Sequence, residues 1–297
     1  MHDSASRKFI DLIFKTSSKW ANWDPPITIK VGHYGTIDRR TGVLQVEGNI
    51  YDEPFQESLK QQGLTIDLSD SSCQPIKGAV EEDMIMSSID VKKGEISLTP
   101  HVSALDLASA SFKAEFQFQQ GKRGAVLVMH KPQQEYIPQG RVLNIIHEAR
   151  KLRDKYIVTS TFTCPGYYLY LSNKSGERVA LALTANAPVA AAIGVSAGGG
   201  ASVDWWTDAQ AAFLRKAFDK AGQYRYTPLF DLKRRQPWFE RTFRGAEVHP
   251  TEDDLWPNCP IPWDPLDEDG NEDTVYDESD EETFSRRSAV EGRFPFV

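Results

Sequence analysis

Histidine is the side chain that most often holds a metal or moves a proton near neutral pH, so the spacing of the histidines indicates which chemistry is available. The chain has six: His2, His33, His101, His130, His147 and His249. None stands at a metal-ligand interval from another histidine or from a carboxylate. His147 falls on the polar side of a predicted helix, which favours a surface residue over a general base. The histidines therefore predict no metal site and no catalytic base.

Cysteine and glycine motifs give no chemistry either. The three cysteines, Cys73, Cys164 and Cys259, are far apart and fit a reducing compartment better than a disulfide framework. Residues 198–200 are Gly-Gly-Gly without the Lys-Ser/Thr that completes a phosphate-binding loop. No nucleophile elbow is present. We therefore expect no enzyme, no cofactor and no metal, and a hydrolase with an unrecognised site stays a third alternative.

Charge is divided unevenly along the chain. Residues 251–297 hold fifteen acidic and three basic residues, a net charge of −12, whereas residues 1–250 carry +4. The overall −8 and the lack of a binding motif argue against a nucleic-acid partner. A solvated, disordered tail and a tail that masks a basic surface both fit this pattern.

The ends and the apolar runs of the sequence bear on location. The N-terminus has no apolar core of a secretory signal, and no stretch approaches about 18 consecutive apolar residues. We expect a cytosolic protein.

Three segments have helical periodicity: residues 7–19, 141–153 and 208–223. The first places bulky apolar residues on one face and Arg7, Lys8, Asp11 and Lys15 on the other. That composition fits a helix at a membrane interface and equally an ordinary core-packing helix with a solvated face.

Strand patterns alternate with these helices. Apolar and polar residues alternate over residues 95–102 and 112–118, and residues 125–129 form a continuous apolar run. Residues 155–164, 167–171, 178–185 and 226–232 are also strand-like, whereas residues 54–83 predict an irregular surface connection.

These elements predict an α+β fold: a twisted, largely antiparallel β-sheet flanked by amphipathic helices, with a poorly ordered acidic C-terminal tail. We place a body at residues 1–245 and the acidic, Pro-rich tail at residues 246–297.

The order of elements resembles one known family. Residues 151–162, Lys-Leu-Arg-Asp-Lys-Tyr-Ile-Val-Thr-Ser-Thr-Phe, resemble the passage from a charged helix into the second membrane-inserting hairpin of the gasdermin pore-forming domain. Residues 94–118 occupy the place of the first hairpin, and residues 31–38 and 47–52 also match loosely. The chain is most similar, over about residues 9–235, to the short gasdermins of fungi. It departs from the family at Asp3, where bacterial relatives carry a lipidated cysteine, and in having an acidic tail instead of a packed repressor domain.

The resemblance implies a latent pore-forming effector of regulated cell death, cytoplasmic when latent and at the plasma membrane when active. A protease or a partner protein would release it to bind anionic lipids, assemble into a large homo-oligomer and insert β-hairpins, because two hairpins cannot close a barrel alone. The alternative is a soluble β-rich interaction module whose acidic tail recruits a basic partner.

Each step has candidate residues. Lipid binding is assigned to the basic side chains of the first two helices: Arg7, Lys8, Lys15, Arg150, Lys151 and Arg153. Membrane insertion is assigned to the dry faces of the strands: Ile96, Leu98, Phe112, Phe116, Val158, Phe162, Leu181 and Leu183.

The tail has two further sets. Its aromatic side chains are expected to anchor it: Trp256, Trp263, Phe294 and Phe296. Cleavage is expected where the chain passes from a basic cluster (Lys233, Arg234, Arg235, Arg241 and Arg244) into exposed, Pro-rich backbone, at Arg235, Arg241, Arg244, Leu255 or Trp256.

Overall fold

A computed structural model describes residues 2–94, 110–138, 140–184, 188–192, 212–236 and 252–272. Its helices are α1 (His2–Ser17), α2 (Glu53–Lys60), α3 (Arg141–Ile146) and α5 (Glu252–Leu255), with single turns of 3₁₀ helix, η1 (Ser71–Cys73) and η3 (Arg150–Leu152). All strand pairings recorded between these residues are antiparallel. The α+β class with largely antiparallel strands is confirmed.

The strands form three sheets. Sheet A joins β1 (Trp20–Ala21), β15 (Tyr226–Arg234), β10 (Tyr156–Cys164), β2 (His33–Ile37) and β3 (Leu44–Asn49), with β9 (Gln133–Tyr136) and β4 (Ile76–Val80) continuing beside β10. Sheet B has the order β14 (Phe213–Phe218), β11 (Gly166–Leu171), β8 (Ala125–His130) and β5 (Met84–Ser87). Sheet C has the order β13 (Pro188–Ala192), β12 (Arg178–Thr184), β7 (Ala110–Phe118) and β6 (Val91–Gly94).

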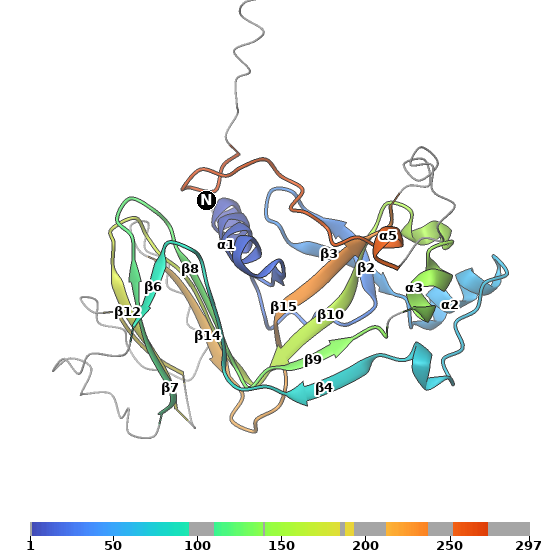
Figure 1. Ribbon diagram of the computed structural model, residues 1–297, viewed down its shortest axis with the longest axis horizontal. Helices are drawn as coiled ribbons and strands as arrows, with labels where there is room; N and C mark the ends of the chain where they lie inside the picture. Colours follow the sequence, from blue (N-terminus) through green and yellow to red (C-terminus); the bar gives the residue numbers. More distant parts are fainter. Residues whose placement is uncertain are drawn as a thin grey trace, which may run out of the picture.

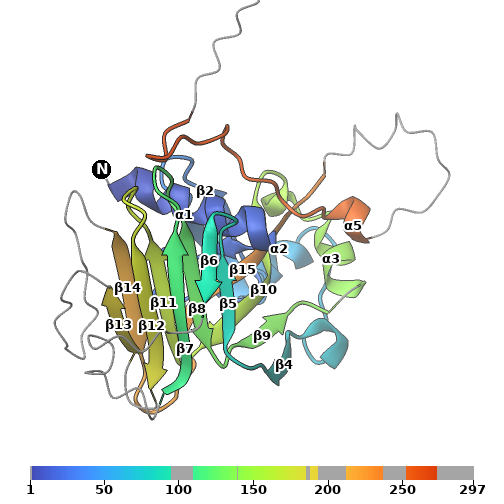
Figure 2. The ribbon, with the colours of Figure 1, turned by 60° about the vertical axis from the view of Figure 1, so that its left-hand side comes forward.

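Sheet B is the middle layer of the molecule. Its Val126, Val128 and Tyr168 pack with the inner face of sheet C, whereas Leu127 and Leu169 pack with α1 and sheet A. Both faces of β8 and β11 are therefore buried, which explains why their sequences are continuous apolar runs. Figures 1 and 2 show the sandwich of sheets B and C on one side of α1.

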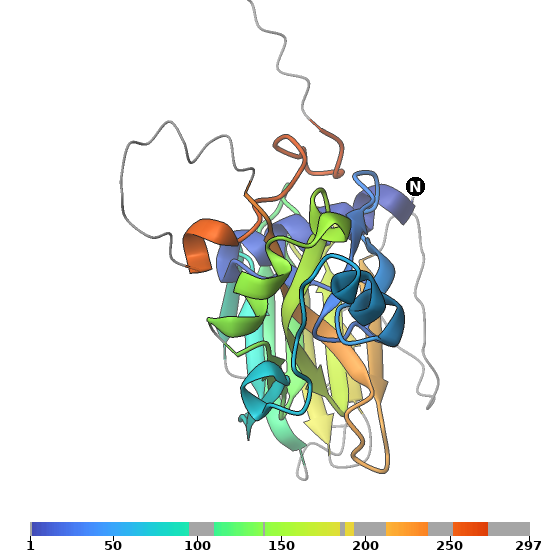
Figure 3. The same ribbon diagram turned by 90° about the vertical axis from the view of Figure 1, so that its right-hand side faces the viewer.

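The remaining helices lie at the other end of sheet A. Residues from α2 and α3, including Phe55, Leu59 and Ile146, form a second core with Ile157 of β10. Figure 3 shows α2 and α3 on the side of the molecule away from the sandwich.

Two predicted helices differ from the structure. The helix expected over residues 141–153 ends at Ile146, because Ala149 adopts an extended backbone before η3, although Val142, Ile146 and Leu152 are buried as expected. The helix expected over residues 208–223 is wrong in its described part. There β14 pairs with β11 along its whole length, so tertiary pairing overrides the local helical periodicity.

Two other expectations are also corrected. Residues 54–83 contain α2, η1 and β4 and are not simply irregular. His147 is 3 % exposed, because its ring packs nearly perpendicular to that of the buried Trp256.

Candidate functional site

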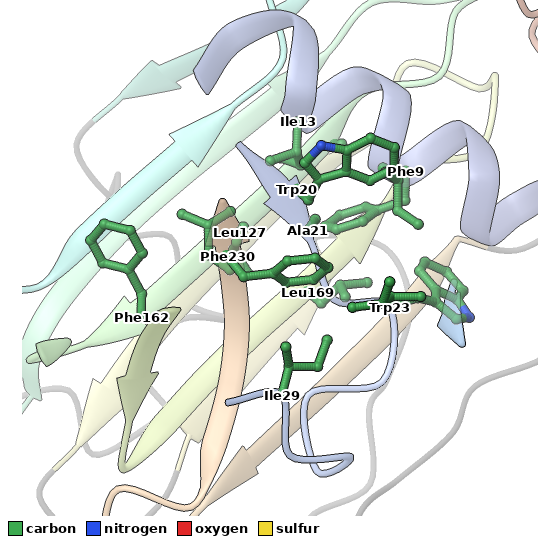
Figure 4. Close-up of a cluster of buried hydrophobic side chains, with 14 of the residues drawn as sticks. Phe9, Ile13, Trp20, Ala21, Trp23, Ile29, Leu127, Phe162, Leu169 and Phe230 are labelled. Carbon is green, nitrogen blue, oxygen red and sulfur yellow. The ribbon is translucent and has the colours of Figure 1, made fainter. Parts of the chain in front are cut away.

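The N-terminal helix α1 is enclosed between sheet A and sheet B. Phe9 and Ile13 are fully buried and converge with Trp20 of β1 and Phe230 of β15 (Figure 4). The opposite face was expected to be solvated, but Lys8 and Asp11 are each only 3 % exposed. This helix therefore lies inside the layered fold rather than flanking one sheet, and the expectation of a solvated face is wrong at Lys8 and Asp11, whereas Lys15 is exposed.

The chain that covers this face is the segment of residues 252–272, which we call the belt. Figure 1 shows it passing from α5, beside α3, across the top of α1. Trp256 is fully buried in the second core and donates a hydrogen bond from Nε1 to the Leu143 carbonyl, 2.8 Å away. Trp263 is 7 % exposed and meets Trp20 edge-on at 5.9 Å between ring centroids. The two aromatic anchors in the described part of the tail are thus core residues.

Between the anchors, the belt is also held through its backbone. The Cys259 amide donates to the Leu232 carbonyl at 3.2 Å, and Lys233 forms an isolated bridge with Asn258. Lys233 Nζ lies 2.7 Å from Asp253 Oδ1. The belt therefore pairs with the edge of β15 through its backbone and is not a detached tail.

The last turn of the belt binds two neighbouring basic residues of α1, Arg7 and Lys8. Arg7 donates to the Gly270 carbonyl from Nε and Nη2, at 3.2 and 2.7 Å, and its Nη1 lies 2.8 Å from Glu272 Oε1. Lys8 Nζ donates to the Asp267 carbonyl at 2.7 Å and lies 3.7 Å from Glu268 Oε2. Carbonyl and carboxylate oxygens of the belt are therefore the partners of both the Arg7 guanidinium and the Lys8 ammonium.

Burial and charge act against each other at Lys8. Burial lowers the pKa of its ammonium, whereas the nearby carboxylates of Glu268 and Asp11 act to raise it. A cation in this position needs oxygen partners, because an isolated buried charge is costly. In this structure the belt provides most of them.

The same turn reaches the sandwich. Glu268 Oε2 accepts a hydrogen bond from the Arg123 amide at 2.6 Å, and Asp269 Oδ1 lies 2.7 Å from Lys174 Nζ. Since Arg123 and Lys174 lie in loops of the sandwich, the turn connects α1 to that body.

Gly270 makes this approach possible. Its φ is +86°, and a Cβ placed there would lie 2.2 Å from the Ser4 carbonyl oxygen. Asp267 closes the turn by accepting hydrogen bonds from the Asp269 and Asn271 amides at 2.8 and 2.9 Å. The sequence Asp-Glu-Asp-Gly-Asn is a turn signal, but we had not predicted that this turn would bind α1.

The other candidate lipid-binding residues lie apart from this contact. Lys15, at the end of α1, is 53 % exposed along its side chain and pairs with Asp11 at 2.7 Å. Arg150, Lys151 and Arg153 are exposed around η3. The structure therefore places the basic candidates on two separate surfaces.

The candidate membrane-inserting residues fall in different sheets. Phe116 of β7 and Leu181 of β12 are fully buried between sheets C and B, and the neighbouring Phe112 and Leu183 are cross-strand partners. Ile96 and Leu98 lie outside the described residues.

Val158 and Phe162 lie in β10 of sheet A, in the core around α1. Residues 151–162 were expected to lead into the second membrane-inserting hairpin, but β10 pairs with β15, β2 and β9 of sheet A, whereas Leu181 lies on β12 of sheet C.

Sheet C contains a hairpin that sequence reasoning missed. β12 pairs with β13, and β6 pairs with β7, so two antiparallel pairs lie side by side through the β7–β12 contact. Ala114, Phe116 and Phe118 face sheet B, whereas Glu115 and Gln117 face outward. The small residues of β13 gave no apolar–polar alternation from which this strand could be predicted.

Comparison of the chain with protein families, curated proteins and solved structures gives no match.

Two observations concern other kinds of site. Among the described residues, no group of three or more histidine, cysteine, aspartate or glutamate side chains is placed to hold a metal ion. Nor does this part of the chain contain a helix that is both long and apolar enough to cross a membrane.

The candidate cleavage positions differ in how exposed they are. Leu255 and Trp256 are 8 % and 0 % exposed, so the expected exposed backbone is wrong at these positions. Arg235 is half-buried. Arg241 and Arg244 lie outside the described residues, as do the remaining tail anchors, Phe294 and Phe296, and the boundary expected at residue 245.

Proposed function

We propose that this chain is a latent membrane-permeabilising effector that the belt keeps inactive. The observation that carries the proposal is the contact of the belt turn with Arg7 and Lys8, the cationic residues at the start of α1. A helix with a basic edge and a bulky apolar face can bind an anionic lipid surface once that edge is free. Removing the belt would free the basic edge, and the apolar face, which packs between sheets A and B, would become available only if α1 then moved away from the sheets.

Sheet C supports the second half of the proposal. β7 has nine residues, close to the roughly 9–11 that a tilted strand needs to cross a bilayer. Its apolar face contacts sheet B, and its outward face carries Glu115 and Gln117. On release, the apolar face would exchange sheet B for lipid and the polar face would line water.

Such a channel needs many copies of the chain. The four strands of sheet C are too few to enclose an aqueous pore, so the active form would be a large ring of subunits at the plasma membrane. The latent form would be cytoplasmic, and its activation would depend on a protease or a partner protein. These steps require no catalytic residue.

The alternative function, an interaction module, predicts a different arrangement of the tail. A tail that recruits a basic partner should present its carboxylates to solution. In the belt, Glu272 contacts Arg7 and Glu268 accepts from the Arg123 amide, whereas Asp253 and Asp269 pair with lysines but stay 85 and 56 % exposed. This intramolecular pairing favours a covering role for the described part of the tail.

A folded protein that is cut afterwards gives the clearest test, because Trp256 and Trp263 belong to the cores and a truncated chain would lack them. A specific protease sequence would replace residues 241–246, and a C-terminal affinity tag would withdraw the tail after cutting. Dye release would be measured from phosphatidylcholine liposomes with and without phosphatidylserine. The control carries the same insertion with an uncleavable scissile residue.

Release only after cutting and withdrawal, and only with phosphatidylserine, would support the proposal. If the protein from which the tail has been withdrawn stays folded and leaves anionic liposomes sealed, the chain is not a permeabilising effector. Binding of the intact tail to a basic partner would then favour the interaction module.

A further inference from the structure

Three described connections join sheet B to sheet C, and all three lie at the same end of the sandwich. Residues 88–90 lead from β5 to β6, residues 119–124 from β7 to β8, and residues 172–177 from β11 to β12. We call these segments the crossing loops. Strand register places them side by side, and Figure 2 shows them next to the start of α1. The connections after β6 and β12, residues 95–109 and 185–187, join strands within sheet C.

The crossing loops are bonded to one another. The Lys174 carbonyl accepts a hydrogen bond from the Gly121 amide at 2.8 Å, and the Ser172 amide donates to the Gly124 carbonyl at the same distance. The Ser88 hydroxyl, from the third loop, accepts from the first amide of β8 at 3.0 Å. The three loops are therefore one connected unit, in which a change of backbone conformation in one loop requires a change in the others.

This unit has the glycines and the free space that a hinge needs. Gly121 and Gly176 have φ angles of +82° and +77°, and no atom lies within 4 Å of a Cβ added at Gly121. A cavity of about 580 Å³ is lined by residues of all three crossing loops and by the outward-facing Gln117 of β7. Glycine tolerates large changes of φ and ψ, and a few such loop residues are enough to turn one packed layer against another.

The belt turn contacts two of the crossing loops. The Arg123 amide donates to Glu268 Oε2 at 2.6 Å, and Lys174 Nζ lies 2.7 Å from Asp269 Oδ1. On its other side the same turn is bonded to Arg7 and Lys8 of α1, which packs in the core with sheet A. The belt turn therefore ties these loops to a part of the molecule that does not include sheet C.

We propose that the crossing loops are the hinge about which sheet C turns away from sheet B, and that the belt turn locks this hinge. The inference rests on the proposed function, in which sheet C exchanges its contact with sheet B for lipid. It gives the belt a second point of action. Besides covering the cations of α1, the belt keeps the sandwich closed.

Opening can be measured in solution, without a membrane, from the accessibility of thiols between the two sheets. Ala114→Cys places a thiol on the buried face of β7, and Val179→Cys places one on the buried face of β12, directly after a crossing loop. A turn about the hinge uncovers position 114 more than position 179, because position 114 is farther from the loops. Unfolding of the body uncovers both positions together with the native Cys164. When closing is faster than labelling, the labelling rate reports the open population.

Glu268 gives the variants that test the lock. Glu268→Ala should raise the labelling rate of Ala114→Cys by at least about threefold, because the Arg123 amide loses a charged acceptor. Glu268→Gln retains an oxygen acceptor for this amide but removes the charge near Lys8, so its labelling rate should stay close to that of the wild-type belt. The matched control is Asp264→Ala, which removes an exposed belt carboxylate that forms no ion pair with the described residues.

A larger increase at Ala114→Cys than at Val179→Cys in the Glu268→Ala protein, with Cys164 and the control unchanged, supports the lock. The proposal is overturned if Glu268→Ala labels like the wild-type belt, or if positions 114 and 179 become equally reactive. It is also overturned if Glu268→Gln labels as fast as Glu268→Ala, since the effect would then run through Lys8.

The same measurement on the cut protein, after withdrawal of the tail, separates this inference from the proposed function. Faster labelling of position 114 with liposomes that stay sealed would contradict only the permeabilising function. Leaking liposomes with unchanged labelling would contradict only the hinge lock.

Discussion

Arg7 and Lys8 show how a single turn of chain can decide what a surface is able to bind. Both were expected to face lipid because they are basic and lie opposite an apolar stripe. Their side chains are instead 12 % and 4 % exposed, since the belt places carbonyl and carboxylate oxygens on them. The sequence identified the two cations, but not their partners more than 250 positions away.

The first prediction concerns Gly270. Gly270→Ala should loosen the belt turn, because an L-residue at φ +86° is strained by about 1–2 kcal/mol and its methyl would collide with the Ser4 carbonyl. Gly222→Ala is the matched control, since its φ is +69° but no atom lies within 4 Å of the added carbon. We expect the undocked population to rise by at least about fivefold only in Gly270→Ala.

Thiol labelling can measure this effect. Cys259 lies in the belt, is 5 % exposed, and its pKa is raised to about 12 by burial. Cys164 is fully buried in the body and reports general unfolding. Faster labelling of Cys259 alone would show belt release, whereas equal labelling in the two glycine variants would contradict the role of Gly270.

The second prediction concerns Asp267 and acid. Burial acts to raise the pKa of Asp267, but hydrogen bonds from Asn271, Asp269 and Gly270 outweigh it and hold the pKa below its ordinary value. A carboxyl with a lowered folded-state pKa stabilises the fold above its ordinary pKa, and this stabilisation is lost as pH falls through the folded pKa. The belt turn should therefore loosen below about pH 4.

The Asp267→Asn variant isolates the effect of protonating Asp267, because asparagine retains one carbonyl acceptor but has no titrating proton. Amide hydrogen exchange at residues 269–271, corrected for intrinsic rates, should accelerate on acidification more in wild type than in the variant. Parallel profiles would mean that Asp267 does not control the turn.

At the scale of elements, strand periodicity predicted the structure better than helical periodicity did. The alternation in residues 112–118 and the apolar run 125–129 specify which faces are dry, and both strands have those faces in the structure. The helix expected at residues 208–223 failed because β14 acquires its conformation from pairing with β11, a contact that no local pattern encodes. The break after α3 was missed for the same kind of reason.

The candidate membrane-inserting residues show the same limit of local patterns. Phe116 and Leu181 were recognised as dry-face residues, but Val158 and Phe162 have the same alternation and lie in another sheet. Alternation gives the face of a strand, whereas sheet membership depends on long-range pairing.

The third prediction uses the outward face of sheet C. If β7 lines an aqueous channel, Glu115→Lys should shift the ion preference of the channel toward anions by about severalfold, because a ring of subunits repeats each substitution. Glu57→Lys on α2 makes the same charge change on an exposed residue outside sheet C and should leave the preference unchanged. Reversal potentials in planar bilayers measure both.

Folding is the control for this experiment, and Glu115 suits it because its side chain points away from sheet B. Leu181→Lys is less informative, since a lysine at a fully buried position would disrupt the sandwich before any membrane is met. An unchanged ion preference in a channel-forming Glu115→Lys protein would exclude β7 from the channel wall.

At the scale of the whole molecule, the belt connects parts that the rest of the chain keeps apart. Trp256 belongs to the core around α2 and α3, Trp263 to the core around α1, and Asp269 contacts a loop of the sandwich. A covering segment with this distribution is part of the folded body. Charge alone had suggested that cutting the chain would free the tail, whereas the buried anchors suggest that it would not.

The fourth prediction follows from those anchors. Protein cut within residues 241–246 should keep its belt bound at micromolar concentration, because each buried tryptophan or leucine contributes about 1.5–3 kcal/mol by burial alone. The two fragments should co-elute in size-exclusion chromatography, and cutting alone should cause little leakage.

Trp263→Ala should weaken the association, since Trp263 packs against Trp20 in the core around α1. The cut variant should therefore release its belt and permeabilise anionic liposomes faster. The uncut Trp263→Ala protein separates this effect from a loss of folding. Immediate separation of the wild-type fragments would show that the peptide connection, and not the buried anchors, holds the belt in place.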